Sequence, residues 1–205
     1  LRTPVTRIKV ALEFLSDSQA KKNIQEDTRE MEQMITVILE EARLRNASQK
    51  LNKQIIDLNR IISDLLKEYA THKTGISIHI PQEETMVEAD ADLLKIVIRN
   101  LLNNAIKFSE PNSNVIVQVE QLDDHVVLTI EDAGQGIPAE QISTLFDSFA
   151  RSTKRGTAGE KGTGLGLAIV KKIVTEHGGT ISVDSVVNEG TIFTITFPLD
   201  RPDNS

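Results

Sequence analysis

The spacing of apolar residues changes near residue 48, and this change limits the chain to a two-part architecture. Up to residue 47, apolar side chains recur at alternating steps of four and three, the heptad pattern of a coiled coil or helical bundle. The two stripes are formed by Leu1, Val5, Ile8, Leu12 and Leu15, and then by Ile24, Thr28, Met31, Ile35, Ile38 and Ala42. Residues 16–18, Ser-Asp-Ser, provide turn and capping groups between them. The pattern predicts an antiparallel two-helix hairpin.

One hairpin cannot cover the long apolar stripe that its two helices share. Two hairpins can do so by forming a four-helix bundle, so we expect a homodimer. The alternative is a monomeric hairpin that packs on its own downstream domain. Residues 46–48, Asn-Ala-Ser, interrupt the heptads. We therefore assign residues 1–48 to the hairpin and 49–205 to a second domain.

The second domain interleaves helical and strand patterns without a strict repeat. Helices are predicted over 55–69, 91–108 and 164–176, and strands over 76–80, 115–119, 126–130, 181–187 and 191–197. Residues 188–190, Asn-Glu-Gly, provide the last turn. The order of elements predicts an α+β fold, in which the hairpin precedes an α/β sandwich with helices on one face of a mixed sheet.

Composition excludes several classes of protein. The net charge is -7 and the pI is about 5.2, so no general nucleic-acid binding is expected, because that requires a basic surface. The chain has no cysteine, which excludes disulfides and thiolate metal sites. No apolar run approaches the roughly 20 residues that span a bilayer, and no signal peptide is visible. Because the chain starts with Leu1 in the middle of a helical pattern, we interpret it as part of a longer protein.

A line of polar residues interrupts the most apolar predicted helix. Asn100, Asn104 and Lys107 are spaced at i, i+4 and i+7 and therefore share one face of the helix. Such groups cost a few kcal/mol each if they lack partners. A magnesium ion and phosphate oxygens would provide partners, because amide oxygens suit Mg²⁺ and a lysine can face a phosphate. The alternative is that these side chains hydrogen-bond to neighbouring backbone groups.

Three further clusters follow along the chain. After a predicted strand, Asp132 can accept a hydrogen bond from an exocyclic amine, and Gly134 and Gly136 allow close approach of a flat ligand. The alternative is an isolated turn.

The segment 145–151 carries two phenylalanines and Arg151, a combination that is also common in core packing. Residues 152–161 are polar and glycine-rich, which predicts a mobile loop. It leads into glycines 162, 164 and 166 at a helix start, where free amides form an anion site, although a plain surface loop is the alternative.

These clusters, in this order, resemble the N, G1, F and G2 boxes of the histidine kinase catalytic domain, a member of the gyrase, Hsp90, histidine kinase and MutL ATPase superfamily. Residues 190–193, Gly-Thr-Ile-Phe, resemble the closing element of that domain, and residues 1–4, Leu-Arg-Thr-Pro, resemble the tail of its H box. The resemblance covers residues 1–198 and implies a sensor histidine kinase that uses ATP and Mg²⁺.

The resemblance also implies a role for each matching residue. By the resemblance, Asp132 binds the adenine amine with support from Thr191, and the base is surrounded by Phe108, Gly134, Gly136 and Ile137. Asn104 binds Mg²⁺ with Asn100 nearby, and Lys107 contacts a phosphate. The phosphates are surrounded by Gly162, Thr163, Gly164, Leu165 and Gly166, and Arg151 is available to the γ-phosphate. Thr3 matches a position linked to dephosphorylation of the partner protein.

The H-box histidine itself would fall just before Leu1. By the resemblance, the γ-phosphoryl group passes to that histidine and then to an aspartate on the receiver domain of a response regulator. The chain would be the cytoplasmic portion of a protein anchored in the inner or plasma membrane of a bacterium. The histidines at 72, 79, 125 and 177 lie outside the H box, and none is expected to be the acceptor.

Three other functions compete with this interpretation. A hydrolytic ATPase of the same superfamily would place a glutamate one turn before the magnesium asparagine, where this chain has Asn100, an amide that cannot act as a general base. A serine/threonine kinase of the same fold would not require the heptad hairpin or residues 1–4. A catalytically silent dimerisation and regulator-binding module would not bind ATP.

Overall fold

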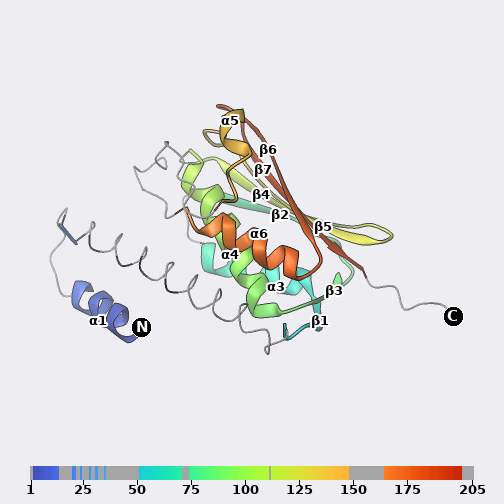
Figure 1. Ribbon diagram of the computed structural model, residues 1–205, viewed down its shortest axis with the longest axis horizontal. Helices are drawn as coiled ribbons and strands as arrows, with labels where there is room; N and C mark the ends of the chain where they lie inside the picture. The colour runs from blue at the N-terminus through green and yellow to red at the C-terminus, as the bar shows by residue number, and fades with distance from the viewer. Residues whose placement is uncertain are drawn as a thin grey trace.

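The computed structural model describes residues 2–13, 51–70, 74–110, 112–147 and 164–199, and residues 20, 21, 24, 28, 31 and 35 (Figure 1). Helix α1 spans Arg2–Glu13. Within it Val5 and Leu12, seven residues apart, are buried, whereas Val10 is exposed. The six isolated positions are helical as well. Most of the second predicted helix and the turn at 16–18 lie outside the described residues.

A five-stranded sheet organises the rest of the chain. Its strands lie in the order β2 (Gly75–His79), β4 (Asn114–Gln121), β5 (His125–Asp132), β7 (Gly190–Pro198) and β6 (Thr180–Val186). Strands β2 and β4 run parallel, and every other neighbouring pair is antiparallel. The sheet is therefore mixed, as the sequence predicts.

Helices cover one face of this sheet (Figure 1). They are α3 (Leu58–Leu66), the 3₁₀ turn η1 (Lys67–Tyr69), α4 (Ala91–Phe108) and α6 (Gly166–Glu176), and a short helix, α5 (Ala139–Ile142), follows β5. Helix α4 begins where Asp90 caps it, with its carboxylate accepting from the Asp92 and Leu93 amides. The bounds of α4 agree with the prediction.

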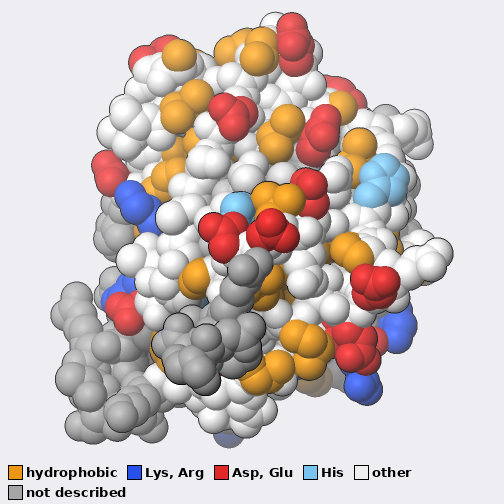
Figure 2. Space-filling view, turned by 90° about the vertical axis from the view of Figure 1, so that its right-hand side faces the viewer, with side chains coloured by type: hydrophobic (Ala, Val, Ile, Leu, Met, Phe, Trp, Pro, Cys, Tyr) orange, Lys and Arg blue, Asp and Glu red, His pale blue; other side chains and the backbone are white. Residues whose placement is uncertain are grey.

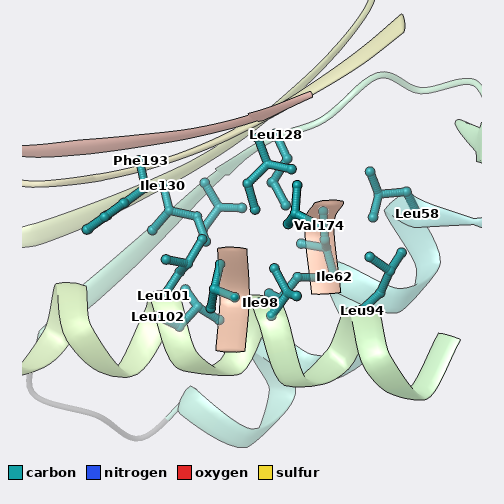
Figure 3. Close-up of a cluster of buried hydrophobic side chains, with 14 of the residues drawn as sticks. Leu58, Ile62, Leu94, Ile98, Leu101, Leu102, Leu128, Ile130, Val174 and Phe193 are labelled. Atoms are coloured by element: carbon teal, nitrogen blue, oxygen red, sulfur yellow. The ribbon is translucent and has the colours of Figure 1, made fainter. Parts of the chain in front are cut away.

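The core lies between α4 and the sheet. Figure 3 shows Leu101 and Ile98 of α4 facing Leu128 and Ile130 of β5, with Ile62 of α3 beside them. Full burial of one such side chain contributes about 1.5–3 kcal/mol. Because α4 buries seven residues in this way, the helix is held rigidly against the sheet. The packed helix can therefore hold the polar side chains on its other face in fixed positions.

One predicted helix begins too early. Residues 55–57 form part of β1 (Gln54–Asp57), which pairs antiparallel with β3 (Met86–Ala89), a strand that the sequence analysis does not predict. Helix α3 starts only at Leu58, because the carboxylate of Asp57 accepts from the Asn59 amide and caps the helix there. The helical spacing of apolar residues therefore extends across a strand–helix boundary.

Figure 2 shows one side of the molecule, across which acidic side chains are spread while basic ones lie near its margins. This face therefore offers a negatively charged rather than a basic surface. Among the described helices, none has both the length and the apolar character needed to cross a membrane.

Candidate functional site

A row of three polar side chains crosses the end of the sheet on its helix-facing side. Asp132 of β5 pairs with Thr191 of β7, and Thr191 pairs with Ser185 of β6. Residues directly opposite each other on antiparallel strands project to the same face. Asp132 and Thr191 are each 5% exposed. The row therefore places polar side chains on the helix-facing side of the sheet, next to the end of the apolar core.

Asp132 is held in place by two backbone amides. The Gly134 amide donates to its Oδ1 at 2.9 Å, and the Thr191 amide donates to the carboxylate as well. Burial, with a smaller contribution from the neighbouring Glu131, raises the pKa of Asp132, the two amides offset part of the rise, and the resulting pKa is about 6. The side chain is thus ionised at neutral pH and can accept a hydrogen bond from a ligand.

The loop after Asp132 is fixed from both sides, which explains its two glycines. A Cβ on Gly134 would lie 2.3 Å from the Phe108 carbonyl oxygen, and Gly136 has a positive φ of 60°. The Gln135 amide donates to that same Phe108 oxygen, while its carbonyl accepts from the amide of Asn188 in the β6–β7 turn. The loop therefore packs against the end of α4 on one side and the turn on the other. Ile137, half-buried, follows directly.

The polar line on α4 is arranged as its spacing predicts. The Asn100 Nδ2 donates to the Ile96 carbonyl at 2.8 Å, which leaves its Oδ1 to point away from the helix. Asn104, half-buried, has no hydrogen-bond partner for its side chain among the described residues. Asn103 lies on another face, where its Oδ1 accepts from the Tyr69 hydroxyl at 3.0 Å. Lys107 lies 5.5 Å from the centre of the Phe108 ring, and both side chains are half-buried.

Helix α6 brings its start to the same place. A Cβ on Gly166, its first residue, would lie 2.7 Å from the Asn100 Oδ1, so glycine allows the two helices to approach. Gly164 has a positive φ of 69°, and the buried Leu165 precedes the helix. The N–H groups in the first turn of a helix carry partial positive charge, which attracts anions. The backbone at Gly166 therefore lies beside the side-chain amide oxygen of Asn100.

The other end of α6 is tied to the start of α4. His177 is 3% exposed, its Nε2 accepts from the Asp90 amide at 3.0 Å, and its Nδ1 donates to the Ile173 carbonyl at 2.7 Å. The imidazole must be neutral for both bonds to exist. His177 is thus a structural residue at a helix end, in agreement with its position before two glycines in the sequence.

Four residues of the predicted site cannot be placed. Arg151, Gly162 and Thr163, and the loop at 152–161, lie outside the described residues, and so does the Thr3 side chain, although Thr3 belongs to α1. Sequence reasoning missed Ser185, the third member of the polar row. Counting back from the 188–190 turn along two paired strands could have placed Ser185 opposite Thr191.

A separate surface groove of about 700 Å³ lies between α3 and the first half of α4. Both acidic and basic side chains line it, and two of them, Arg99 and Glu68, form an ion pair at 2.9 Å. In the part of the chain that the structure describes, no cluster of three or more His, Asp or Glu side chains could hold a metal ion. The polar row, the glycine loop and the facing helices α4 and α6 therefore form the candidate site.

The comparisons with known proteins cover the part of the chain that contains this site. The family described as histidine kinase-, DNA gyrase B-, and HSP90-like ATPase matches residues 89–201, which include every element of the candidate site. The sensor protein kinase WalK of Staphylococcus aureus (strain MRSA252) is 34% identical over 213 residues, which cover 98% of this chain and 35% of that protein. The chain thus spans about a third of the length of this relative.

Two solved structures extend the comparison. The mycobacterial sensor histidine kinase MprB is 32% identical with a TM-score of 0.61, and the match covers 71% of this chain and 97% of that one. The Acinetobacter baumannii histidine kinase AdeS shares the fold over 98% of this chain and 97% of its own, with a TM-score of 0.70 and 23% identity. The chain therefore belongs to the histidine kinase-, DNA gyrase B-, and HSP90-like ATPase family, and within it carries the ATP-binding domain of a sensor histidine kinase.

Proposed function

We propose that the chain binds Mg-ATP in the candidate site and transfers the γ-phosphoryl group to a histidine. The carboxylate of Asp132 carries the proposal, because it is buried, ionised at neutral pH and beside a loop built for close approach. It would accept from the adenine amine, with Thr191 beside it. Phe108 and Ile137 would contact the base, since both are half-buried at the edges of the glycine loop.

The side chains on α4 fit a magnesium ion. The side-chain nitrogen of Asn100 donates to the Ile96 carbonyl, so its side-chain oxygen can coordinate an ion. The Asn104 side chain has no hydrogen bond to another described residue. Hard amide oxygens together with phosphate oxygens are ligands that Mg²⁺ accepts. Asn104 would hold the ion, with Asn100 nearby, and the ion would neutralise charge on the phosphates. Lys107 would add a cation to the same face.

The phosphate groups would lie at the start of α6. Gly164, Leu165 and Gly166 contribute backbone amides there, and Gly162, Thr163 and Arg151 are proposed to complete the binding of the triphosphate. Phosphoryl transfer depends mainly on positioning and on neutralising charge, which such a site can provide. Asn100 cannot activate water as a glutamate would, which favours transfer to a histidine over hydrolysis.

In the whole protein, the acceptor histidine is proposed to precede Leu1 at the start of the hairpin. The phosphoryl group would then pass to an aspartate of a response regulator, and Thr3 would orient water for the reverse, phosphatase, activity. Residues 1–48 would form the four-helix bundle of a homodimer, with a membrane anchor elsewhere in the protein. The ATP-binding domain is proposed to span 49–205.

Titration calorimetry of chain 1–205 with ATP, with and without Mg²⁺, tests nucleotide binding. Asp132→Ala should weaken binding by about 1–3 kcal/mol, the scale for an unpaired buried hydrogen-bonding group. Asn104→Ala should remove the effect of Mg²⁺, whereas Asn103→Ala, on the face toward Tyr69, should not. Unchanged affinity in a folded Asp132→Ala protein would refute the assignment of the base site.

A phosphorylation assay tests the transfer step. With γ-labelled ATP, chain 1–205 should gain no acid-labile, base-stable phosphate, because its histidines lie inside the ATP-binding domain and cannot be presented by the hairpin. In-line transfer requires the nucleophile within roughly 3–3.5 Å of the phosphorus. A chain extended by His-Glu before Leu1 should become labelled. Label on one of the four histidines of chain 1–205 would contradict this proposal.

A further inference from the structure

Ser185 connects three parts of the candidate site through one oxygen atom. Its Oγ donates to the Gly190 carbonyl at 2.7 Å, accepts from the Ile137 amide at 2.8 Å, and lies 2.9 Å from the Thr191 Oγ1. Gly190 and Thr191 begin strand β7 and Ile137 follows the glycine loop, so Ser185 connects its own strand β6 to both. The single proton and both lone pairs of the Ser185 hydroxyl are therefore engaged in hydrogen bonds.

The direction of the bond between the two hydroxyls follows from these contacts. A hydroxyl has a single proton, and a carbonyl oxygen can only accept. If the Ser185 proton pointed at Thr191, two oxygen lone pairs would face each other at 2.7 Å between Ser185 and Gly190. The Ser185 proton therefore points at Gly190, and Thr191 donates its own proton to Ser185.

This direction determines what Thr191 can offer a ligand. Its only proton is directed at Ser185, so toward the site it presents lone pairs. Asp132, its neighbour in the row, is an ionised carboxylate and likewise only accepts. The two side chains together present acceptors and no side-chain donor to the edge of a base.

We propose that Ser185 is a positioning residue that orients the Thr191 hydroxyl and thereby makes the site select purines with an amino group at C6 over those with a carbonyl. An amine donates to two acceptors, whereas a carbonyl oxygen would face them with its own lone pairs. The inference rests on the proposed binding of the ATP base beside Asp132.

Binding of ATP and of inosine triphosphate to chain 1–205 tests the proposal. Inosine triphosphate has a carbonyl at C6 and a proton on N1 but is otherwise the same molecule. The ratio of the two affinities is the readout. In Ser185→Ala the Thr191 proton is free to turn toward the ligand, and the ratio should fall about fivefold, the size of one net hydrogen bond. Ser182→Ala, on the same strand but exposed, should leave the ratio unchanged.

A double-mutant cycle with Thr191→Val shows whether Ser185 acts through Thr191. Thr191→Val should lower the ratio by itself, and adding Ser185→Ala should lower it no further. A Ser185→Ala protein that weakens both nucleotides equally would show a structural role only and overturn the proposal. A normal ratio in Thr191→Val would overturn it too, even if Ser185→Ala fails to fold. Wild-type protein that binds neither nucleotide would instead refute the proposed function, and equal binding of both would refute only the selectivity.

Discussion

At the scale of single residues, burial raises the pKa of Asp132 but leaves its carboxylate ionised at neutral pH. Burial alone would favour the neutral acid, but the amides of Gly134 and Thr191 stabilise the charge and keep the pKa at about 6. The residue is therefore ionised at neutral pH and still close to its titration range. As the pH falls, Asp132 should therefore become protonated at a higher pH than an exposed aspartate does.

Nucleotide affinity should consequently fall as the pH drops below about 6. The proposed bond to the base needs the carboxylate, so protonation of the free protein opposes binding, by about tenfold per pH unit once the acid form predominates. Calorimetric titration from pH 5 to 8 measures this. Asp132→Ala is the control, because its pH profile lacks the titration of residue 132 and keeps that of the nucleotide and of the other protein groups. Parallel profiles for the two proteins would contradict the prediction.

Gly134 should tolerate no side chain. An alanine Cβ would meet the Phe108 carbonyl oxygen at 2.3 Å, and this contact is with backbone that cannot rotate away. We expect Gly134→Ala to weaken ATP binding by at least about 1 kcal/mol through displacement of the loop. Gly75→Ala is a matched control, because its Cβ would approach the Asn114 side chain at 3.0 Å and the nearest backbone atom, the Ser113 carbonyl oxygen, only at 3.8 Å. Equal effects of the two substitutions on ATP affinity would count against a site at the loop.

At the scale of elements, α6 runs antiparallel to the first half of α4 and contacts that half at both ends of α6. Gly166 packs against Asn100 at one end, and His177 accepts from the Asp90 amide at the other. Asp90 also accepts from the amide of Asn52. Asp90 therefore connects α4, the end of α6 and the segment that leads into β1.

This connection should make stability depend on pH. Burial lowers the pKa of His177 below its usual 6.5, Lys53 lowers it further, and the Ile173 carbonyl, Asp90 and Glu176 oppose the shift. Because the fold needs the neutral ring, its stability should be complete above pH 6.5 and should decline as the pH falls below that value. Thermal unfolding of wild type and His177→Gln from pH 5 to 8 should show a steeper acid loss in the wild type. Identical slopes would exclude His177 as the cause.

The sequence could predict elements whose signals are local. The bounds of α4 follow from Asp90 as a cap and from an unbroken apolar pattern, and the glycine positions mark the loop after β5. It could not predict β1, because four residues pair with a strand about 30 residues away while their apolar spacing continues into α3. The contact between Asp90 and His177 joins positions 87 residues apart, and no local pattern encodes it.

At the scale of the whole molecule, the described residues contain one principal apolar core. It includes side chains from Leu58 to Phe197, drawn from α3, α4, α6 and the sheet. Val5 and Leu12 of α1 are buried too, but they do not belong to this cluster. The ATP-binding domain therefore does not draw its core from helix α1.

A shortened chain that begins at residue 49 should fold and bind ATP by itself. Because the core and the candidate site both lie after this point, its ATP affinity should stay within about twofold of that of chain 1–205. Calorimetry and thermal unfolding of the two chains measure this. A shortened chain that unfolds below 37 °C, a temperature at which a typical domain of this kind is folded, would show that the hairpin stabilises the domain.

The contacts of His177 also hold the C-terminal end of α6 in place, far from the proposed phosphate site, so that this end can act as a fulcrum. Eleven helical residues place Gly166 about 16 Å from that fulcrum. A tilt of about 10° there would move the Gly166 end of the helix by about 3 Å, the length of a hydrogen bond. Small adjustments of packing around Asp90, beside residues 51–53, would therefore be amplified into the making or breaking of contacts at the proposed phosphate site.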